Sequence, residues 1–224
     1  MIAKTGLARG SQLRNELANL WGIEPGDPAI RETVQAAITA DYLRVHVLHA
    51  EWAGAHRKLV ELTSAGQDRA AQLGCPCAPS ELAESNRRGL DLETLNLVLA
   101  GADILRASGY TEVCVFPPAV ALPAGVTYAP MLSARDQTGA TIYVECARSS
   151  SLMPRSTRWQ VAAQAGGGAL YLIAPTPAIL VRLTTEINVA RLQSDFRVMA
   201  LNVNEHLKGR RGSNDSIWFY QRHS

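Results

Sequence analysis

Apolar positions recur at helical spacing in the second half of the chain, with shorter strand-like runs between them. Between residues 92 and 105 an apolar side chain stands at every third or fourth position. This spacing predicts a helix over 91–108 that begins at Asp91 and ends before Gly109. The same criteria predict strands over 111–116, 169–174 and 196–203 and helices over 155–165 and 177–192. This order of elements indicates a mixed α/β domain.

A β-hairpin is predicted in the middle of the second half. Residues 131–135 and 141–146 flank the turn Asp136–Gly139, which supplies a side-chain acceptor and a glycine able to adopt a positive φ. Successive side chains of a strand point to opposite faces, so Glu145 and Ala147 share one face of the sheet. Glu145 is therefore a candidate functional carboxylate.

The first half predicts a different and smaller arrangement. Residues 11–21 and 27–40 are predicted as helices, the second capped by Asp27 and opened by Pro28. Strands are predicted over 42–49 and 57–63, and a closing helix over 67–73. The stretch LTSAGQDRAAQLG at 62–74 resembles the junction in winged-helix domains where the second wing strand passes into a closing helix. The first half is therefore expected to be a winged helix-turn-helix domain.

Length and composition agree with two small domains. We expect the winged helix over 1–78, a linker over 79–90 and the mixed-sheet domain over 91–224, because CPCAPS at 75–80 and SNRRG at 85–89 are typical of connecting segments. The apolar runs contain prolines or charges, so no membrane span is predicted, and Met1-Ile-Ala-Lys does not begin a secretory signal. Four cysteines in a chain of this size favour a reducing, cytoplasmic setting.

The hairpin resembles the core of the PD-(D/E)XK, or restriction-endonuclease-like, superfamily. In that superfamily an aspartate and a glutamate hold Mg²⁺, and a lysine assists the nucleophile. Glu145 matches the glutamate, whereas Met131 and Ala147 stand at the aspartate and lysine positions. A single carboxylate is a poor site for a hard divalent cation. We therefore expect no catalytic residues and no metal or other cofactor.

A second resemblance covers most of the chain. A winged helix followed by a degenerate nuclease-like domain is similar to the replication-relaxation family of plasmid and conjugative-element proteins. The matching pieces are LTSAG at 62–66, DLETLN at 91–96, Pro130, YVECAR at 143–148, Arg158-Trp159 and GGGALYLIAP at 166–175. Family members commonly keep an aspartate after that proline, and this chain has Met131 there. The resemblance implies a DNA-binding or assembly factor of a mobile element or its host.

Charge supports DNA binding only locally. The chain has 22 basic and 20 acidic residues, and residues 1–78 have eight of each. A basic face normally accompanies non-specific DNA binding. The candidate nucleic-acid-binding residues are Arg31, Thr33 and Gln35 in the first half and Arg148, Arg155, Arg158, Lys208, Arg210 and Arg211 in the second. A neutral winged helix is also typical of protein interaction or dimerisation, so a protein scaffold or homodimer is an alternative function.

A third function is a divergent Mg²⁺-dependent DNA endonuclease. In that case Glu145 would act with Glu93 or Asp136, and Glu145 and Glu93 would be the metal ligands. Structural interpretations compete with this one: Glu145 can be a strand glutamate at the sheet edge or paired with Arg158, and Glu93 can serve the helix dipole near a helix N-terminus. Convergence of the three carboxylates would distinguish the endonuclease from the other functions.

Overall fold

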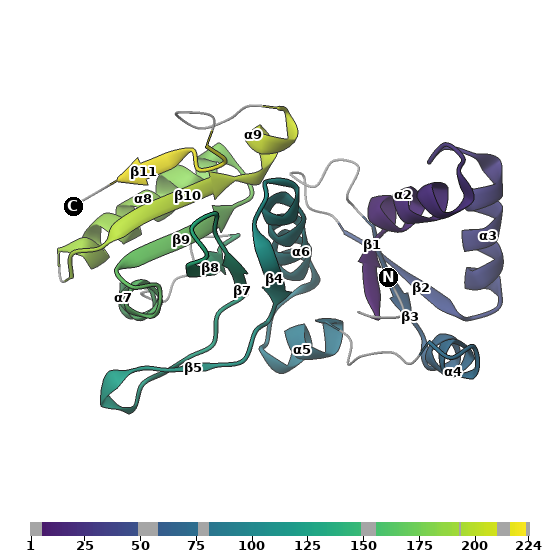
Figure 1. Ribbon diagram of the computed structural model, residues 1–224, viewed down its shortest axis with the longest axis horizontal. Helices are drawn as coiled ribbons and strands as arrows, with labels where there is room; N and C mark the ends of the chain where they lie inside the picture. Colours follow the sequence, from purple (N-terminus) through teal and green to yellow (C-terminus); the bar gives the residue numbers. More distant parts are fainter. Residues whose placement is uncertain are drawn as a thin grey trace. The chain divides into compact units, whose positions relative to one another are not determined.

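The computed structural model describes residues 6–48, 58–75, 81–148, 156–192, 194–209 and 216–222. The chain divides into two compact units, unit 1 (Met1–Asn96) and unit 2 (Leu97–Ser224). Both units contain helices and a sheet (Figure 1), which confirms the mixed α/β class. The division falls within helix α6 (Leu92–Ala107), and most of the expected linker 79–90 forms helix α5 (Glu81–Arg87).

Unit 1 is built on a small antiparallel sheet in the order β1-β3-β2, with β1 at Leu7–Arg9, β3 at Lys58–Leu62 and β2 at Leu43–Val47. Helices α2 (Gly10–Trp21), α3 (Pro28–Thr39) and α4 (Ser64–Gln72) accompany this sheet. Each helix and strand predicted in the first half is present with bounds that differ by up to three residues, positions 49 and 57 of the predicted strands lie outside the described residues, and β1 was not predicted. A small core of buried Ala8, Leu13 and Val60, with half-buried neighbours, joins α2 to the sheet.

The caps explain where two of these helices begin. Asp27 accepts a hydrogen bond from the Ala29 N–H at 2.8 Å, and Pro28 occupies the first turn of α3, as predicted. Helix α4 begins earlier than expected because Thr63 caps it: the Thr63 hydroxyl oxygen accepts from the Gly66 N–H at 3.1 Å. The cap is set by one side chain that the apolar pattern does not reveal.

Unit 2 contains a mixed sheet in the order β11-β10-β9-β8-β7-β4. Strand β9 pairs in parallel with both β8 and β10, and the other pairings are antiparallel. The strands are β4 (Thr111–Val115), β7 (Leu132–Arg135), β8 (Thr141–Cys146), β9 (Ala169–Ala174), β10 (Arg197–Asn202) and β11 (Tyr220–Arg222). The helices beside them are α7 (Ser156–Ala165), α8 (Pro177–Arg191) and α9 (Val203–Leu207).

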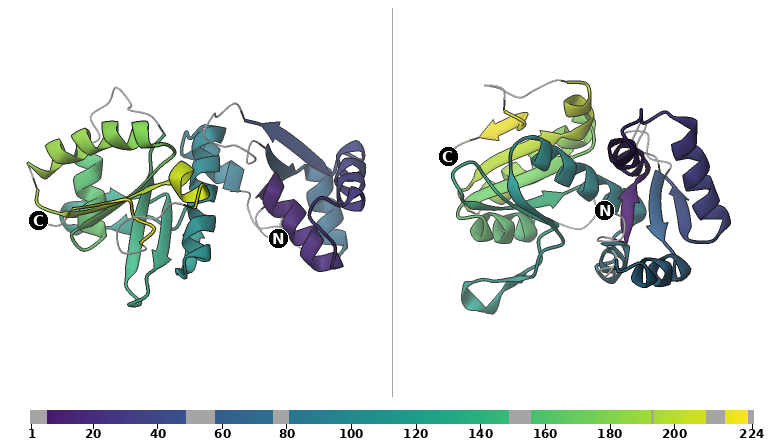
Figure 2. Two further views of the ribbon diagram at one scale, coloured as in Figure 1. Left: turned by 90° about the horizontal axis from the view of Figure 1, so that it is seen from above. Right: turned by 45° about the vertical axis from the view of Figure 1, so that its right-hand side comes forward.

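Helices cover both faces of this sheet. Gly101 of α6 lies against Ile173 and Leu132, since a Cβ at Gly101 would come within 2.5 Å of Ile173 Cδ1 and 3.2 Å of Leu132 Cδ1. Helices α7 and α8 pack on the other face, where Figure 2 (left) shows them crossing each other. Their core includes the buried side chains of Trp159 and Ile187. The α7 and α8 face is the one that carries Glu145.

The predicted hairpin is confirmed as β7 and β8, with Leu132 opposite Val144 and Arg135 opposite Thr141. One excursion was not predicted. Between β4 and β7 the chain forms a two-stranded ladder of β5 (Val120–Ala121) and β6 (Thr127–Tyr128), joined by the short helix η2 (Pro123–Gly125), which projects as an arm in Figure 1. This arm supplies one of the residues around Glu145. Among the described residues no helix is long and apolar enough to cross a membrane.

Candidate functional site

Glu145 lies on β8 with 2% of its surface exposed. Its neighbour in register on β9 is Leu172, which belongs to the core under α7 and α8. Ala147, two residues further along the same face, is also buried in that core. A buried carboxylate must be hydrogen-bonded or paired with a cation, because burial removes its hydration. The groups that surround Glu145 therefore decide what it can do.

Three donors hold the Glu145 carboxylate. Arg158 of α7 donates from Nε to Oε2 at 2.7 Å and from Nη2 to Oε1 at 2.9 Å, which is a bidentate ion pair. The Tyr128 hydroxyl at the end of β6 donates to Oε1 at 2.5 Å. The Arg158 guanidinium also donates to the Ala129 carbonyl at 3.2 Å and lies 5.7 Å from the centroid of the Tyr128 ring. The interpretation of Glu145 as the partner of Arg158 is confirmed.

The charges of this cluster shift the titration of its members. Burial, followed by the adjacent Glu145 carboxylate, raises the pKa of Tyr128. Burial alone would lower the pKa of Arg158, but the charge and hydrogen bonds of Glu145 outweigh it, and the pKa of Arg158 is raised. Burial also raises the pKa of the neighbouring Cys146 thiol well above its ordinary value. The three raised pKa values favour the protonated forms of the Tyr128 phenol, the Arg158 guanidinium and the Cys146 thiol.

The residues around Glu145 do not fit a magnesium site. At the aspartate position of the nuclease pattern, the Met131 sulfur accepts a hydrogen bond from the Cys146 N–H at 3.4 Å. Ala147, at the lysine position, is 5% exposed and part of the core. A thioether is a soft, neutral ligand, whereas Mg²⁺ selects hard oxygen ligands. Within the described ranges, no cluster of three or more His, Cys, Asp or Glu side chains could hold a metal ion.

The other two candidate carboxylates are Asp136 and Glu93, and each has a local structural role. Asp136 lies in the hairpin turn, where its Oδ1 accepts hydrogen bonds from the Thr138 N–H, the Thr138 hydroxyl and the Ala140 N–H. These bonds, the Thr138 hydroxyl first, lower the pKa of Asp136. Glu93 lies in the first turn of α6, where a negative charge favours the helix dipole. The candidate set Glu145, Glu93 and Asp136 therefore does not form a metal-binding group in the described structure.

The basic residues predicted in the second half are partly engaged with carboxylates. Arg158 holds Glu145, and the Lys208 amine lies 3.4 Å from Glu205. Arg148 is half-buried just after β8. Arg155, Arg210 and Arg211 lie outside the described residues. A shared phosphate-binding surface of these residues stays a prediction.

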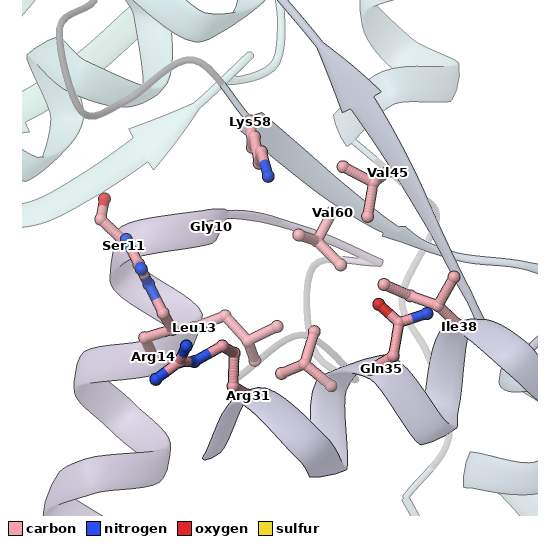
Figure 3. A pocket seen from close by; sticks show the side chains of 11 residues that line it. Gly10, Ser11, Leu13, Arg14, Arg31, Gln35, Ile38, Val45, Lys58 and Val60 are labelled. Carbon is pink, nitrogen blue, oxygen red and sulfur yellow. The ribbon is translucent and has the colours of Figure 1, made fainter. Parts of the chain in front are cut away.

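Unit 1 contains a cavity of about 300 Å³ between α2, α3 and the sheet (Figure 3). Its apolar lining consists of Leu13, Val34, Ile38, Val45 and Val60. Its polar lining comprises Ser11, Arg14, Arg31, Gln35 and Lys58, together with the backbone of Gly10. Two of the residues predicted to bind nucleic acid, Arg31 and Gln35, therefore meet at one cavity. The third, Thr33, is exposed on α3 and is not part of the lining.

The cavity concentrates positive charge in a unit whose overall charge is close to zero. Figure 3 shows the Lys58 amine directed from β3 toward the space between the helices, and Arg31 extending from α3 toward α2. Arg14 of α2 lies next to Arg31 in the same lining. No acidic side chain of the residues that the structure describes lines the cavity. Within the described part of the chain, none of these three cations forms an ion pair.

Arg14 and Lys58 were not among the predicted site residues. They are 44 positions apart, and they reach one cavity because β1, which leads directly into α2, pairs with β3. The available signal was the position of Arg14 beside the apolar Leu13 in the predicted helix over 11–21. That position puts Arg14 at the border of the packed face.

Comparisons with protein-family models, with curated proteins and with solved structures found no match for this chain.

Proposed function

We propose that the chain is a DNA-binding or assembly factor in which unit 1 contacts the nucleic acid and unit 2 is a nuclease-like scaffold that does not cleave. Two element orders support this proposal. In unit 1 a pair of helices, α2 and α3, precedes a two-stranded hairpin and a closing helix, which is the order expected of a winged helix. In unit 2 the order α6, β4, β7, β8, α7, β9, α8 and β10, with β5, η2 and β6 inserted between β4 and β7, resembles the plan expected of the restriction-endonuclease-like superfamily.

One observation carries the DNA-binding part of the proposal. Arg14, Arg31 and Lys58 come from α2, α3 and β3 and line one cavity, to which the described residues contribute no carboxylate. Like charges brought together repel one another, and an anionic ligand removes that repulsion. Phosphate groups are the anions that DNA offers to arginine and lysine, and their neutralisation releases condensed counterions. Among the described residues of unit 1, the cavity is therefore where we expect a DNA phosphate to bind.

The non-cleaving part of the proposal rests on the state of Glu145. A carboxylate that binds a catalytic metal must present free oxygen lone pairs to it. In unit 2 both Glu145 oxygens accept bonds from Arg158, and one accepts a further bond from Tyr128. The resemblance to the replication-relaxation family adds a biological setting, replication or transfer of a plasmid or conjugative element, in which a non-cleaving DNA-binding protein is useful.

The test is a titration of fluorescently labelled duplex DNA with the full chain, followed by anisotropy at several salt concentrations. Log affinity falls with log salt, and we expect this slope to become less steep by about 0.9 for each phosphate contact removed. The variant with Arg14→Gln, Arg31→Gln and Lys58→Gln should then lower the slope by up to about 2.7, the sum of three such contacts. Arg182→Gln, an exposed position on α8, is the matched control that removes one charge from unit 2.

The outcomes separate the functions. A slope reduced in the triple variant and unchanged in Arg182→Gln supports binding through unit 1. Absence of binding to duplex and single-stranded DNA at low salt would contradict the proposal and favour the protein scaffold. Binding with the same salt slope in the triple variant and the wild type would place the interface elsewhere.

A further inference from the structure

We propose that the cavity of unit 1 takes a single unpaired nucleotide, with its phosphate at Arg14, Arg31 and Lys58 and its base on the apolar lining. This inference rests on the proposed function, because it names the form of nucleic acid that the same site accepts. The ligand chemistry is that of a nucleoside phosphate. Its source is either an unpaired position in a DNA strand or a free nucleotide.

The shape of the site favours an inserted group over a flat contact. A volume of about 300 Å³ lies at the lower end of the range for small-molecule sites. Duplex DNA presents phosphates on a convex backbone while its bases remain stacked inside, so a duplex contacts the rim of such a cavity and leaves its interior unfilled. A nucleotide that has left the stack has a compact, planar base that can enter.

The interior has the apolar character that a base requires. Five aliphatic side chains line it: Leu13 from α2, Val34 and Ile38 from α3, Val45 from β2 and Val60 from β3. Leu13 and Val60 are buried, whereas the other three are half-buried. Half-buried apolar surface that faces a cavity gains from contact with an apolar ligand face. Binding pockets for extruded bases use such apolar walls.

The polar lining contains the side-chain types that a nucleotide needs. The three cations offer positive charge to a phosphate, and guanidinium groups bind phosphate with parallel N–H bonds. Gln35, in the same lining, has an amide that can donate and accept at the edge of a base. Inorganic phosphate alone would use the cations and leave Gln35 and the five aliphatic side chains without contacts. The lining as a whole therefore fits a nucleoside phosphate better than a bare anion.

The test compares three probes on the full chain: a labelled single-stranded oligonucleotide, a labelled blunt duplex of equal length and a nucleoside 5′-monophosphate as competitor. Ile38→Trp fills the cavity and keeps all three cations. We expect it to weaken single-strand binding by about tenfold or more and duplex binding by less than about twofold. Asn19→Trp, at an exposed position on α2 outside the lining, should leave both unchanged.

A second variant guards against a folding defect in Ile38→Trp. Gln35→Leu removes the amide at nearly the same volume and lies at an exposed helical position. It should weaken single-strand binding about five- to tenfold, because a base edge loses a hydrogen-bonding partner. Circular dichroism and thermal unfolding of each variant check that the fold is kept.

The probes also distinguish the two sources of the nucleotide. Competition by the monophosphate that is lost in Ile38→Trp supports a free nucleotide, and single-strand preference without such competition supports an unpaired position in a strand. If folded Ile38→Trp and Gln35→Leu bind single strands like the wild type, the inference is wrong. Duplex binding that then still depends on Arg14, Arg31 and Lys58 would leave the proposed function standing.

Discussion

Removal of Arg158 should destabilise unit 2 by leaving Glu145 buried without its cation. Breaking a buried ion pair from one side costs about 3–5 kcal/mol. The Glu145 side chain is 2% exposed, whereas that of Arg158 is 42% exposed, so water can replace part of the guanidinium. Tyr128 remains as one donor. We therefore expect Arg158→Met to lower the free energy of unfolding of this region by about 2–3 kcal/mol, after a reduction for that solvent access.

The measurement is hydrogen exchange by mass spectrometry on peptides that cover β8 and β9. Exchange of local regions is preferable to a global melt because two compact units need not unfold in a single transition. The expected loss corresponds to exchange that is roughly 30- to 150-fold faster in Arg158→Met. Arg182→Met, at an exposed position on α8, is the matched control and should exchange like the wild type.

A double variant tests the stated cause. In Glu145→Gln with Arg158→Met the buried group is neutral and no longer needs a cation, so β8 should exchange more slowly than in Arg158→Met alone. Exchange in Arg158→Met within about threefold of the wild type would refute the reasoning, because a threefold change corresponds to less than about 1 kcal/mol. Faster exchange in the double variant than in Arg158→Met would refute it as well.

Three further outcomes follow from the structure. Burial and Glu145 raise the pKa of Tyr128, so with rising pH the unfolded chain loses this phenolic proton before the folded chain does. The contribution of Tyr128 to the free energy of unfolding is therefore complete below the ordinary tyrosine pKa of about 10 and is lost as the pH rises above it. In urea unfolding, Tyr128→Phe should therefore remove about 1.4 kcal/mol of the total fall in stability between about pH 9 and 11, and a fall equal to that of the wild type would contradict this. In a urea titration, Gly66→Ala should lower the free energy of unfolding of unit 1 by about 1–3 kcal/mol, because the new Cβ would clash with the Tyr42 carbonyl oxygen. The control is Gly26→Ala, whose Cβ meets no described atom within 4 Å and which should change this free energy by less than about 0.5 kcal/mol. The full chain should not cleave plasmid DNA with Mg²⁺ or Mn²⁺, and metal-dependent cleavage that disappears in Glu145→Ala would overturn this expectation.

Elements with a strong local signal were predictable from the sequence. The β7 and β8 hairpin has alternating side chains and a turn in which Asp136 bonds its own neighbours, so its register follows from a few adjacent residues. Strands of two or three residues have no such signal. Strand β1 depends on Leu7 pairing with Glu61, and β11 on Tyr220 pairing with Ala200, and these partners lie outside any local window.

In the candidate sites, too, contacts between residues of successive elements were predictable from the sequence, and contacts that depend on short or distant strands were not. The pair of Glu145 and Arg158 was foreseeable as an alternative, because a strand and the following helix bring together residues 13 positions apart. The Tyr128 hydroxyl bond was not predicted, since it depends on the short β6 strand of the projecting arm. Helix α5 was expected as a linker because its segment ELAESNR is mostly polar, with Leu82 as its buried apolar residue.

Placing the residues of the nuclease pattern at positions 131 and 147 would not by itself give Glu145 the surroundings of a metal site. A lysine at Ala147 would carry its ammonium into the core that contains Trp159, where an unpaired charge is strongly unfavourable. An aspartate at Met131 would leave Glu145 held by Arg158. The Arg158 guanidinium supplies the positive charge that balances the buried Glu145 carboxylate, and it does so from α7, whose Trp159 is part of the core. Glu145 thus joins β8 to α7 through Arg158, a structural role in which both of its carboxylate oxygens accept hydrogen bonds.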